Sequence, residues 1–176
     1  MRIVAILLLC ACANSPQLPN KSPESTSQRL GLKATAKCAS LPEETRVSVS
    51  ARVVESEKGP GIHFRLTNTS GQPLRLYRFL LPWGNANAIE LAAVGTNGDI
   101  AAVFWPIDDP SAEQPFGLAP GQSLEGETFL RYRITEIDAA RSRSDVVVTW
   151  CYRFTVLDDQ SAGRITGTVV VPKRAG

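Results

Sequence analysis

The sequence predicts an all-β fold, an antiparallel β-sandwich of about eight strands, from residue 46 to near the end of the chain. Two observations carry this prediction. Apolar and polar side chains alternate with a period of two through most of that region. Gly, Pro, Asn and Asp separate the alternating segments at the short intervals typical of sandwiches. The 176 residues, 43% hydrophobic and 20% charged, are enough for one globular domain and too few for two large ones.

The first two strands are predicted at residues 46–54 and 62–68, on either side of a turn at Gly59-Pro60-Gly61. In "RVSVSARVV" every second side chain is apolar, and "IHFRLTN" repeats the pattern. His63 falls on the polar, outward face of the second segment. The apolar side chains that define the inward faces are Val47, Val49, Ala51, Val53, Ile62, Phe64 and Leu66.

The middle of the chain supplies shorter alternating segments. "LRLYRFL" (74–80) is interpreted as a strand, and "AIELAAV" (88–94) and "IAAVFWP" (100–106) as a hairpin. The Asn97-Gly98 pair between the last two tolerates the positive φ of a tight hairpin turn. "SLEGETFLRY" (123–132) is the next predicted strand.

The segment from Val146 to Val156 contributes most to the predicted core. Its large side chains, each worth roughly 1.5 to 3 kcal/mol when buried, fall on one face. "RITGTVVV" (164–171) is the last strand, and residues 135–143 are predicted to form a short helix or turn that crosses between the sheets. The core-facing side chains are Val146, Val148, Trp150, Tyr152, Phe154 and Val156.

Two cysteines remain outside the N-terminal region, Cys151 on the opposite face of that segment and Cys38 before the first strand. In an exported protein two such cysteines more often pair than stay free, so we expect a disulfide between them. The bridge would close a loop of more than a hundred residues, for which chain entropy gives on the order of 4 to 5 kcal/mol. It would also hold the end of the tether against the outside of the sandwich. The sandwich domain is expected to comprise residues 38–176. Two unpaired thiols are the competing interpretation.

The N-terminus has the three parts of a secretory signal. Basic Arg2 precedes an apolar core from Ile3 to Leu9, and a small-residue region begins at Cys10. The core is too short to span a bilayer, since spanning takes about 20 apolar residues.

The run "LCAC" (9–12) resembles the lipobox of bacterial lipoprotein signals, although Cys10 stands where Ser, Ala or Thr is more usual. The resemblance implies a signal peptide of residues 1–11, cleavage before Cys12, and lipid on the Cys12 sulfur and amine. Two or three acyl chains, at about 0.8 kcal/mol per buried CH₂, would make the attachment lasting. An ordinary cleaved signal with a soluble product is the alternative.

Residues 12–37 are predicted to form the lipid anchor and a flexible tether. They are rich in Ser, Pro, Asn, Thr, Gln and Lys and nearly free of large apolar residues before Leu30. Such a composition cannot bury enough apolar area to offset the entropy of ordering. In a bacterium with two membranes, Ala13 lacks the Asp that favours inner-membrane retention, so the outer membrane is the expected destination.

Several stretches together resemble the immunoglobulin-like amino-terminal region of deuterolysin-type metalloproteases. They are "IHFRLTNTSGQPLRLYRFLLPWG", "VGTNGDIAAVFWP", "LAPGQSLEGETFLRYRI" and "DVVVTWCYRF", within residues 46–156. The small bacterial intracellular proteinase inhibitors have a similar rhythm, with the Asn-Thr-Ser-Gly turn and the Leu-Ala-Pro-Gly-Gln-Ser element. Both resemblances imply an immunoglobulin-like sandwich. Neither transfers a catalytic residue, because the His-Glu-x-x-His zinc motif is absent from this sequence.

The residue types and motifs of the sequence predict no enzyme, no cofactor and no metal site. His63 is the only histidine, whereas catalytic zinc needs three converging protein ligands. The sequence has no Gly-x-Ser-x-Gly elbow, phosphate loop or dinucleotide fingerprint. Lys and Arg exceed Asp and Glu by only 19 to 17, so a nucleic-acid partner is not expected.

A candidate binding loop runs from Pro106 to Gly117, "PIDDPSAEQPFG", with Phe116 as its apolar contact. Long, proline-stiffened loops on rigid sandwiches are common recognition sites. Its carboxylates, Asp108 and Asp109, fall short of the six to eight oxygens that Ca²⁺ requires.

Trp83, just beyond a predicted strand, is a second candidate contact, for which packing in the core is the alternative. An outward row of arginines is the third feature, and cross-strand pairing with Glu125 and Glu127 explains it most simply. The row consists of Arg65, Arg131, Arg133 and Arg153.

We therefore expect a membrane-anchored envelope lipoprotein whose sandwich binds another protein, in envelope assembly or in restraining a protease. Two alternatives remain: an envelope enzyme with an unrecognised site, and an accessory protein of a secreted peptidase.

Overall fold

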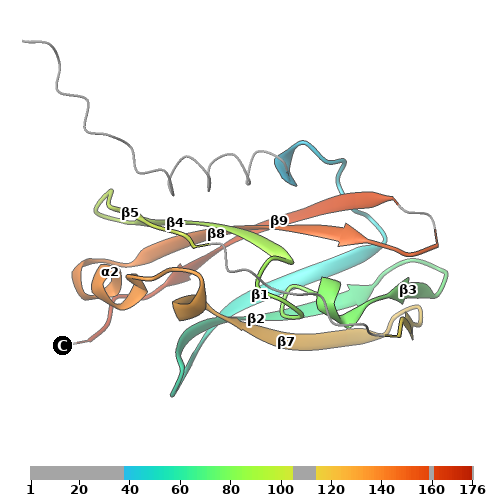
Figure 1. The fold of residues 1–176 in the computed structure, drawn as a ribbon, viewed down its shortest axis with the longest axis horizontal. Coiled ribbons are helices and arrows are strands. Elements are labelled where there is room, and N and C mark those ends of the chain that lie inside the picture. Colours follow the sequence, from blue (N-terminus) through green and yellow to red (C-terminus); the bar gives the residue numbers. More distant parts are fainter. Residues whose placement is uncertain (1–37, 105–113, 159–160, 176) are drawn as a thin grey trace, which may run out of the picture.

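The computed structural model describes residues 38–104, 114–158 and 161–175, and these residues form an antiparallel β-sandwich (Figure 1). This confirms the predicted all-β class. The helical elements are η1 (Arg78–Leu80), η2 (Leu130–Tyr132) and α2 (Ile137–Arg143). The strands are β1 (Val47–Ser56), β2 (Gly59–Asn68), β3 (Leu74–Leu76), β4 (Ile89–Gly95), β5 (Ile100–Ala101), β6 (Phe116–Leu118), β7 (Ser123–Phe129), β8 (Val146–Thr155) and β9 (Ala162–Val171).

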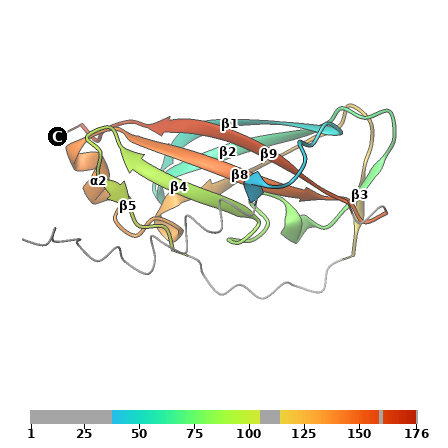
Figure 2. The same ribbon diagram turned by 90° about the horizontal axis from the view of Figure 1, so that it is seen from above.

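The strand order is that of an immunoglobulin-like sandwich. A three-stranded sheet has the order β1-β2-β7, and a four-stranded sheet has the order β5-β4-β8-β9. These correspond to strands A-B-E and C′-C-F-G of the immunoglobulin fold. The short β6 pairs with β3 in a separate two-stranded sheet, so it does not extend the three-stranded one. Both views place α2 at one end of the sandwich and β3 at the other (Figures 1 and 2).

Several predicted boundaries were wrong in detail. Gly59-Pro60-Gly61 is not the first turn, because these residues open β2 and the reversal lies at residues 57–58, with Gly59 at φ +90°. The strand expected at 74–80 ends at Leu76, where the chain turns into η1. The Asn97-Gly98 turn is confirmed, since the Gly95 amide donates to the Asp99 carbonyl at 2.7 Å and Gly98 has φ +90°.

The two facing sheets meet in an aromatic layer. The ring of Phe64 on β2 meets that of Trp150 on β8 edge to face, with centroids 5.4 Å apart. Every large side chain predicted to face inward from β8 is buried, Trp150 at 3% exposure among them. The Trp150 indole lies over Gly167 of β9, where a Cβ atom would come within 2.4 Å of the ring. A glycine therefore makes the room that this indole needs.

The predicted disulfide is present between Cys38 and Cys151, and both cysteines are 2% exposed. Cys38 lies on the outer face of the four-stranded sheet, as expected from the parity of β8. Beyond it the chain follows the β9 strand, where the Glu44 amide donates to the Arg164 carbonyl and the Arg164 amide donates to the Pro42 carbonyl. The blue start of the described chain lies beside β9 in Figure 1.

The short helix expected at 135–143 is confirmed as α2, which joins the end of η2 to β8 and thereby crosses from one sheet to the other. Its inward face buries Ile137, Ala140 and Arg141. The helix is consequently fixed to one end of the sandwich.

Candidate functional site

The predicted lipidation site Cys12 and the loop carboxylates Asp108 and Asp109 lie outside the described residues. Phe116, expected as the apolar contact of the binding loop, is instead half-buried in β6, where it is the register partner of Leu76. The guanidinium of Arg78 lies 5.3 Å from the centroid of its ring. The sequence missed β6 because a three-residue strand is too short to display a period.

Trp83 is not a free aromatic anchor. It is half-buried and packs against the core, which confirms the alternative interpretation. A Cβ atom on Gly126 of β7 would lie only 2.3 Å from the indole. Thr128 on the same strand is buried and donates its hydroxyl hydrogen to the Pro82 carbonyl at 2.8 Å. The segment around Trp83 therefore closes the side of the core along β7.

The predicted arginine row is only partly correct. Arg65 is exposed and lies 3.6 Å from Glu125, which also lies 3.4 Å from the half-buried His63. This cross-strand pairing agrees with the expectation for the outer face of β2 and β7. Arg153 is exposed but lies on β8, in the four-stranded sheet. Glu127 lies on β7, where it is the register partner of His63.

Arg133 contradicts the predicted row, because it points inward and is 1% exposed. Its guanidinium donates to three carbonyls, those of Ala86, Ile89 at 3.0 Å and Phe104 at 3.2 Å. Burial lowers the pKa of Arg133 to about 10. The side chain thus ties the segment before β4 to the segment after β5.

A charged hollow of about 230 Å³ lies at the α2 end of the sandwich and is the candidate functional site. The tip of the β1–β2 hairpin, η2, α2 and the C-terminal segment converge there. The residues that line the hollow are Glu55, Ser56, Glu57, Gly59, Arg131, Asp138, Arg141 and Arg174.

Two arginines of the hollow are fixed by ion pairs. The Arg141 side chain is 7% exposed, pairs with the Glu55 carboxylate, and donates through Nε to the Pro172 carbonyl at 2.9 Å. Arg131 Nε lies 2.7 Å from the Asp138 carboxylate. These contacts join the hairpin, the helix and the C-terminal segment into one rim.

The remaining charges of the hollow point to solvent. Arg174 is exposed, and its amide donates to the Arg141 carbonyl at 2.9 Å, which fixes its backbone. Within the described part of the chain its guanidinium and the Glu57 carboxylate have no ion-pair partner. The hollow therefore presents one positively charged and one negatively charged side chain that are available to a ligand, beside arginines held by ion pairs.

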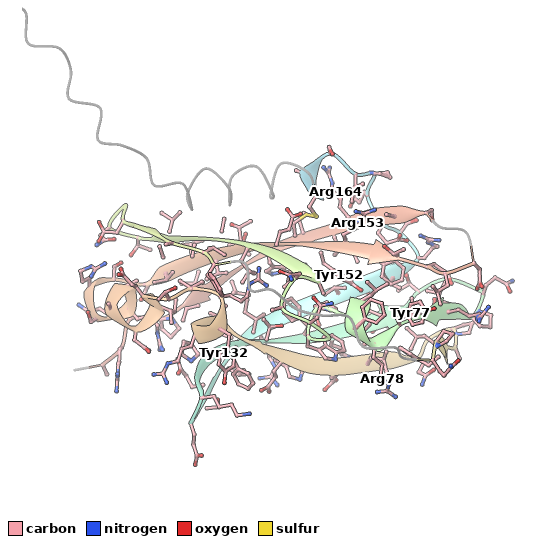
Figure 3. All side chains as sticks on the ribbon, viewed as in Figure 1. Tyr77, Arg78, Tyr132, Tyr152, Arg153 and Arg164 are labelled. Carbon is pink, nitrogen blue, oxygen red and sulfur yellow. A yellow bond between two sulfur atoms is a disulfide. The ribbon has the colours of Figure 1, made fainter. Side chains whose placement is uncertain are left out.

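An exposed aromatic side chain lies next in the chain to Arg131, which lines the hollow. Tyr132 follows Arg131 in η2 and is 65% exposed, and Figure 3 shows it at the α2 end. Its ring meets Phe129 edge to face at 6.3 Å, and Lys58 Nζ lies 5.1 Å from the centroid of Phe129 on the hairpin side. An aromatic ring that packs against a neighbouring ring and still exposes most of its surface to solvent suits protein recognition.

The hollow has no recognisable catalytic or metal-binding set. Among the residues that the structure describes, no three His, Cys, Asp or Glu side chains are grouped to hold a metal ion. No helix in the described ranges is long and apolar enough to cross a bilayer. No protein-family model matches the chain, and no curated protein sequence matches it.

Proposed function

We propose that the chain is an envelope lipoprotein, anchored in the outer membrane through lipid on Cys12, whose sandwich binds a protein partner at the charged hollow. The domain acts as an interaction module and has no catalytic role of its own. Because the sequence resembles protease-associated domains, a protease is the first partner to test. In this proposal the domain restrains that protease.

The exposure of Tyr132 beside the hollow is the observation that carries the binding proposal. A tyrosine supplies a large contact area with few rotatable bonds, and tyrosine and arginine are enriched among the residues that dominate interface energies. Here the ring is 65% exposed although it is supported by Phe129. Burying it against a partner would stabilise a complex at little cost in side-chain entropy.

The charges around the hollow support a protein as the ligand. Arg174 and Glu57 offer opposite charges on one rim, so a partner surface with the complementary pair would be oriented as well as attracted. The paired Arg131–Asp138 and Arg141–Glu55 contacts hold that rim in place. A preformed rim lowers the ordering cost of association.

Affinity capture from detergent-solubilised envelopes tests the binding. The wild type, Tyr132→Ala and the matched control Tyr77→Ala would be compared, because Tyr77 lies at the opposite, β3 end (Figure 3). We expect one protein to be retained by the wild type and Tyr77→Ala and to fall at least about 10-fold with Tyr132→Ala, as loss of a hot-spot residue predicts. Equal retention by all three would reject the hollow as the site.

The lipid anchor is tested separately by mass spectrometry of the N-terminal peptide. The expected wild-type peptide begins at Cys12 and carries acyl chains, whereas a Cys12→Ser variant carries none. Lipid that persists in Cys12→Ser would reject the assignment.

A further inference from the structure

The edge strand β9 of the four-stranded sheet carries another strand along only part of its free side. Near its start, the amide and the carbonyl of Arg164 both bond to residues 42–44, so these main-chain groups point away from β8. Because this direction alternates along a strand and the register with β8 is unbroken, the main-chain groups of Thr166, Thr168 and Val170 point the same way. Within the described residues, these groups have no hydrogen-bond partner on that side.

This open edge, residues 166–170, lacks the features that usually prevent edge pairing. Natural sheets protect such edges with charged side chains, prolines or bulges. The outward side chains here are the uncharged, β-branched Thr166, Thr168 and Val170, all of them exposed. By contrast β1, at the edge of the other sheet, carries the exposed Arg52. The open edge is therefore a site at which another strand can pair.

The segments on either side of the open edge restrict which strand fits. Residues 42–44 already lie beside Arg164, so an added strand has to end before it reaches them. The open edge itself spans about 17 Å. A long foreign strand would collide with residues 42–44. An antiparallel copy of β9 avoids the collision, because β9 ends at Val171 and its C-terminal end is the one that approaches them.

We propose that β9 pairs antiparallel with β9 of a second copy, about a two-fold axis at Val170. In this register Val170 lies opposite its own counterpart, and the Thr168 amide faces the Pro172 carbonyl of the second copy. An axis at Thr168 is excluded, because it would put residues 42–44 of each copy where Pro172 of the other copy lies. The two four-stranded sheets thereby become one continuous sheet.

The side chains around the axis agree with this register. Val94, Val147 and Val170 are register partners in a row on the outer face, and Val170 is 53% exposed. The two-fold axis makes this row continuous with the same row of the second copy, and it covers Val170 with a valine, a favourable cross-strand pair. The exposed Glu43 of each copy comes toward the basic residues 173–174 of the other, so the charges that approach are opposite.

The pairing has consequences for the charged hollow and for the N-terminal segment. The Pro172 carbonyl accepts a hydrogen bond from Arg141 at 2.9 Å, so the two hollows lie close to the axis, and a partner that reaches both gains avidity. The axis is perpendicular to the sheet, so both Cys38–Cys151 disulfides lie on the same face of the dimer. Pairing needs neither a lipid nor another protein, so it can hold or fail independently of the proposed function.

Oxidative cross-linking of the full chain tests the axis. Directly opposed residues of a hydrogen-bonded antiparallel pair have Cα atoms about 5.5 Å apart, within the range of a disulfide. Val170→Cys is compared with Val94→Cys, on the same face two strands away, and with Ser50→Cys, exposed on β1 of the opposite sheet. We expect a disulfide-linked dimer from Val170→Cys alone on a non-reducing gel. No dimer from that variant, equal dimers from all three, or a link only to another protein would overturn the proposal.

Sedimentation of the full chain in a density-matched detergent tests the main-chain bonds. Thr168→Pro removes the amide that points to the second copy, and proline is tolerated on an edge strand, whereas Thr168→Val keeps the amide. Since the two-fold axis doubles the loss, the dimer dissociation constant should rise about 10-fold or more with Thr168→Pro and stay near the wild-type value with Thr168→Val. Thermal unfolding checks that both variants fold. A wild type that stays monomeric at all concentrations, or an equal rise in both variants, would overturn the proposal.

Discussion

Phe64 and Trp150 contact each other edge to face across the middle of the sandwich, with an interplanar angle of 88°. They lie on β2 and β8, the two strands that a disulfide joins in antibody domains. In this protein an aromatic pair connects those strands, and the disulfide has a different place, between Cys38 and the outer side of β8. The core and the attachment of the N-terminal segment are therefore stabilised separately.

Removal of the aromatic contact between Phe64 and Trp150 should lower the free energy of unfolding. Phe64 is fully buried, so Phe64→Ala is expected to lower the free energy of unfolding by about 3 to 5 kcal/mol. Phe64→Leu keeps most of the volume and should cost less. Urea denaturation with a constant m-value measures both; a change under 1 kcal/mol for Phe64→Ala would contradict the packing.

The contact between Gly126 and Trp83 predicts a steric effect. Gly126→Ala places a Cβ atom within 2.3 Å of the Trp83 indole and should destabilise the domain by about 1 to 3 kcal/mol, as overpacking does. Gly117→Ala is the matched control, since no atom lies within 4 Å of its Cβ position. Thermal unfolding of the two variants makes the comparison. Equal effects would mean that Trp83 does not cover β7.

The Cys38–Cys151 bridge spans a sequence separation of 113 residues. Its removal in the double variant Cys38→Ser, Cys151→Ser should lower the free energy of unfolding by about 4 to 5 kcal/mol on the chain-entropy account. Non-reducing peptide mapping first establishes the bridge in the purified protein, and denaturation then measures its contribution. Two free thiols in the wild type would contradict the structure.

Glu44 predicts a dependence of stability on pH. Burial opposes ionisation of its carboxyl, but hydrogen bonds from Arg46 outweigh that effect and lower the pKa of Glu44 below its usual 4.5. The contribution of the ionised form is therefore complete above pH 4.5 and is lost as pH falls through the folded-state pKa. The difference in stability between wild type and Glu44→Gln should shrink between pH 6 and pH 3. A difference that grows on acidification would refute the assignment.

The long strands could be predicted because burial on one face imposes a clear period of two on strands such as β2 and β8. The disulfide could be predicted because only two cysteines remain outside the N-terminal region. The period of two failed at η2. Strand parity in "LRYRI" puts Tyr132 inside and Arg133 outside, but a 3₁₀ helix turns by about 120° per residue where a strand alternates by 180°. The actual arrangement is the reverse, with Tyr132 exposed and Arg133 buried. No local signal separates these alternatives, since carbonyls distant in sequence satisfy the guanidinium.

The 3₁₀ helix η2 also contributes to the candidate site, because it carries both the exposed Tyr132 and the lining residue Arg131. The charged hollow also depends on Arg141 and Glu55, which are 86 residues apart and share no sequence pattern. Such a site can be found only after the fold has brought the hairpin, the helix and the C-terminal segment together.

Photo-cross-linking from position 132 in intact envelopes tests the central claim, that this domain binds a protein at the charged hollow. We expect one discrete protein adduct from position 132, none from position 50, and a large loss of the adduct when Arg174→Glu is added. An absent adduct, or the same adducts from both positions regardless of Arg174, would contradict it.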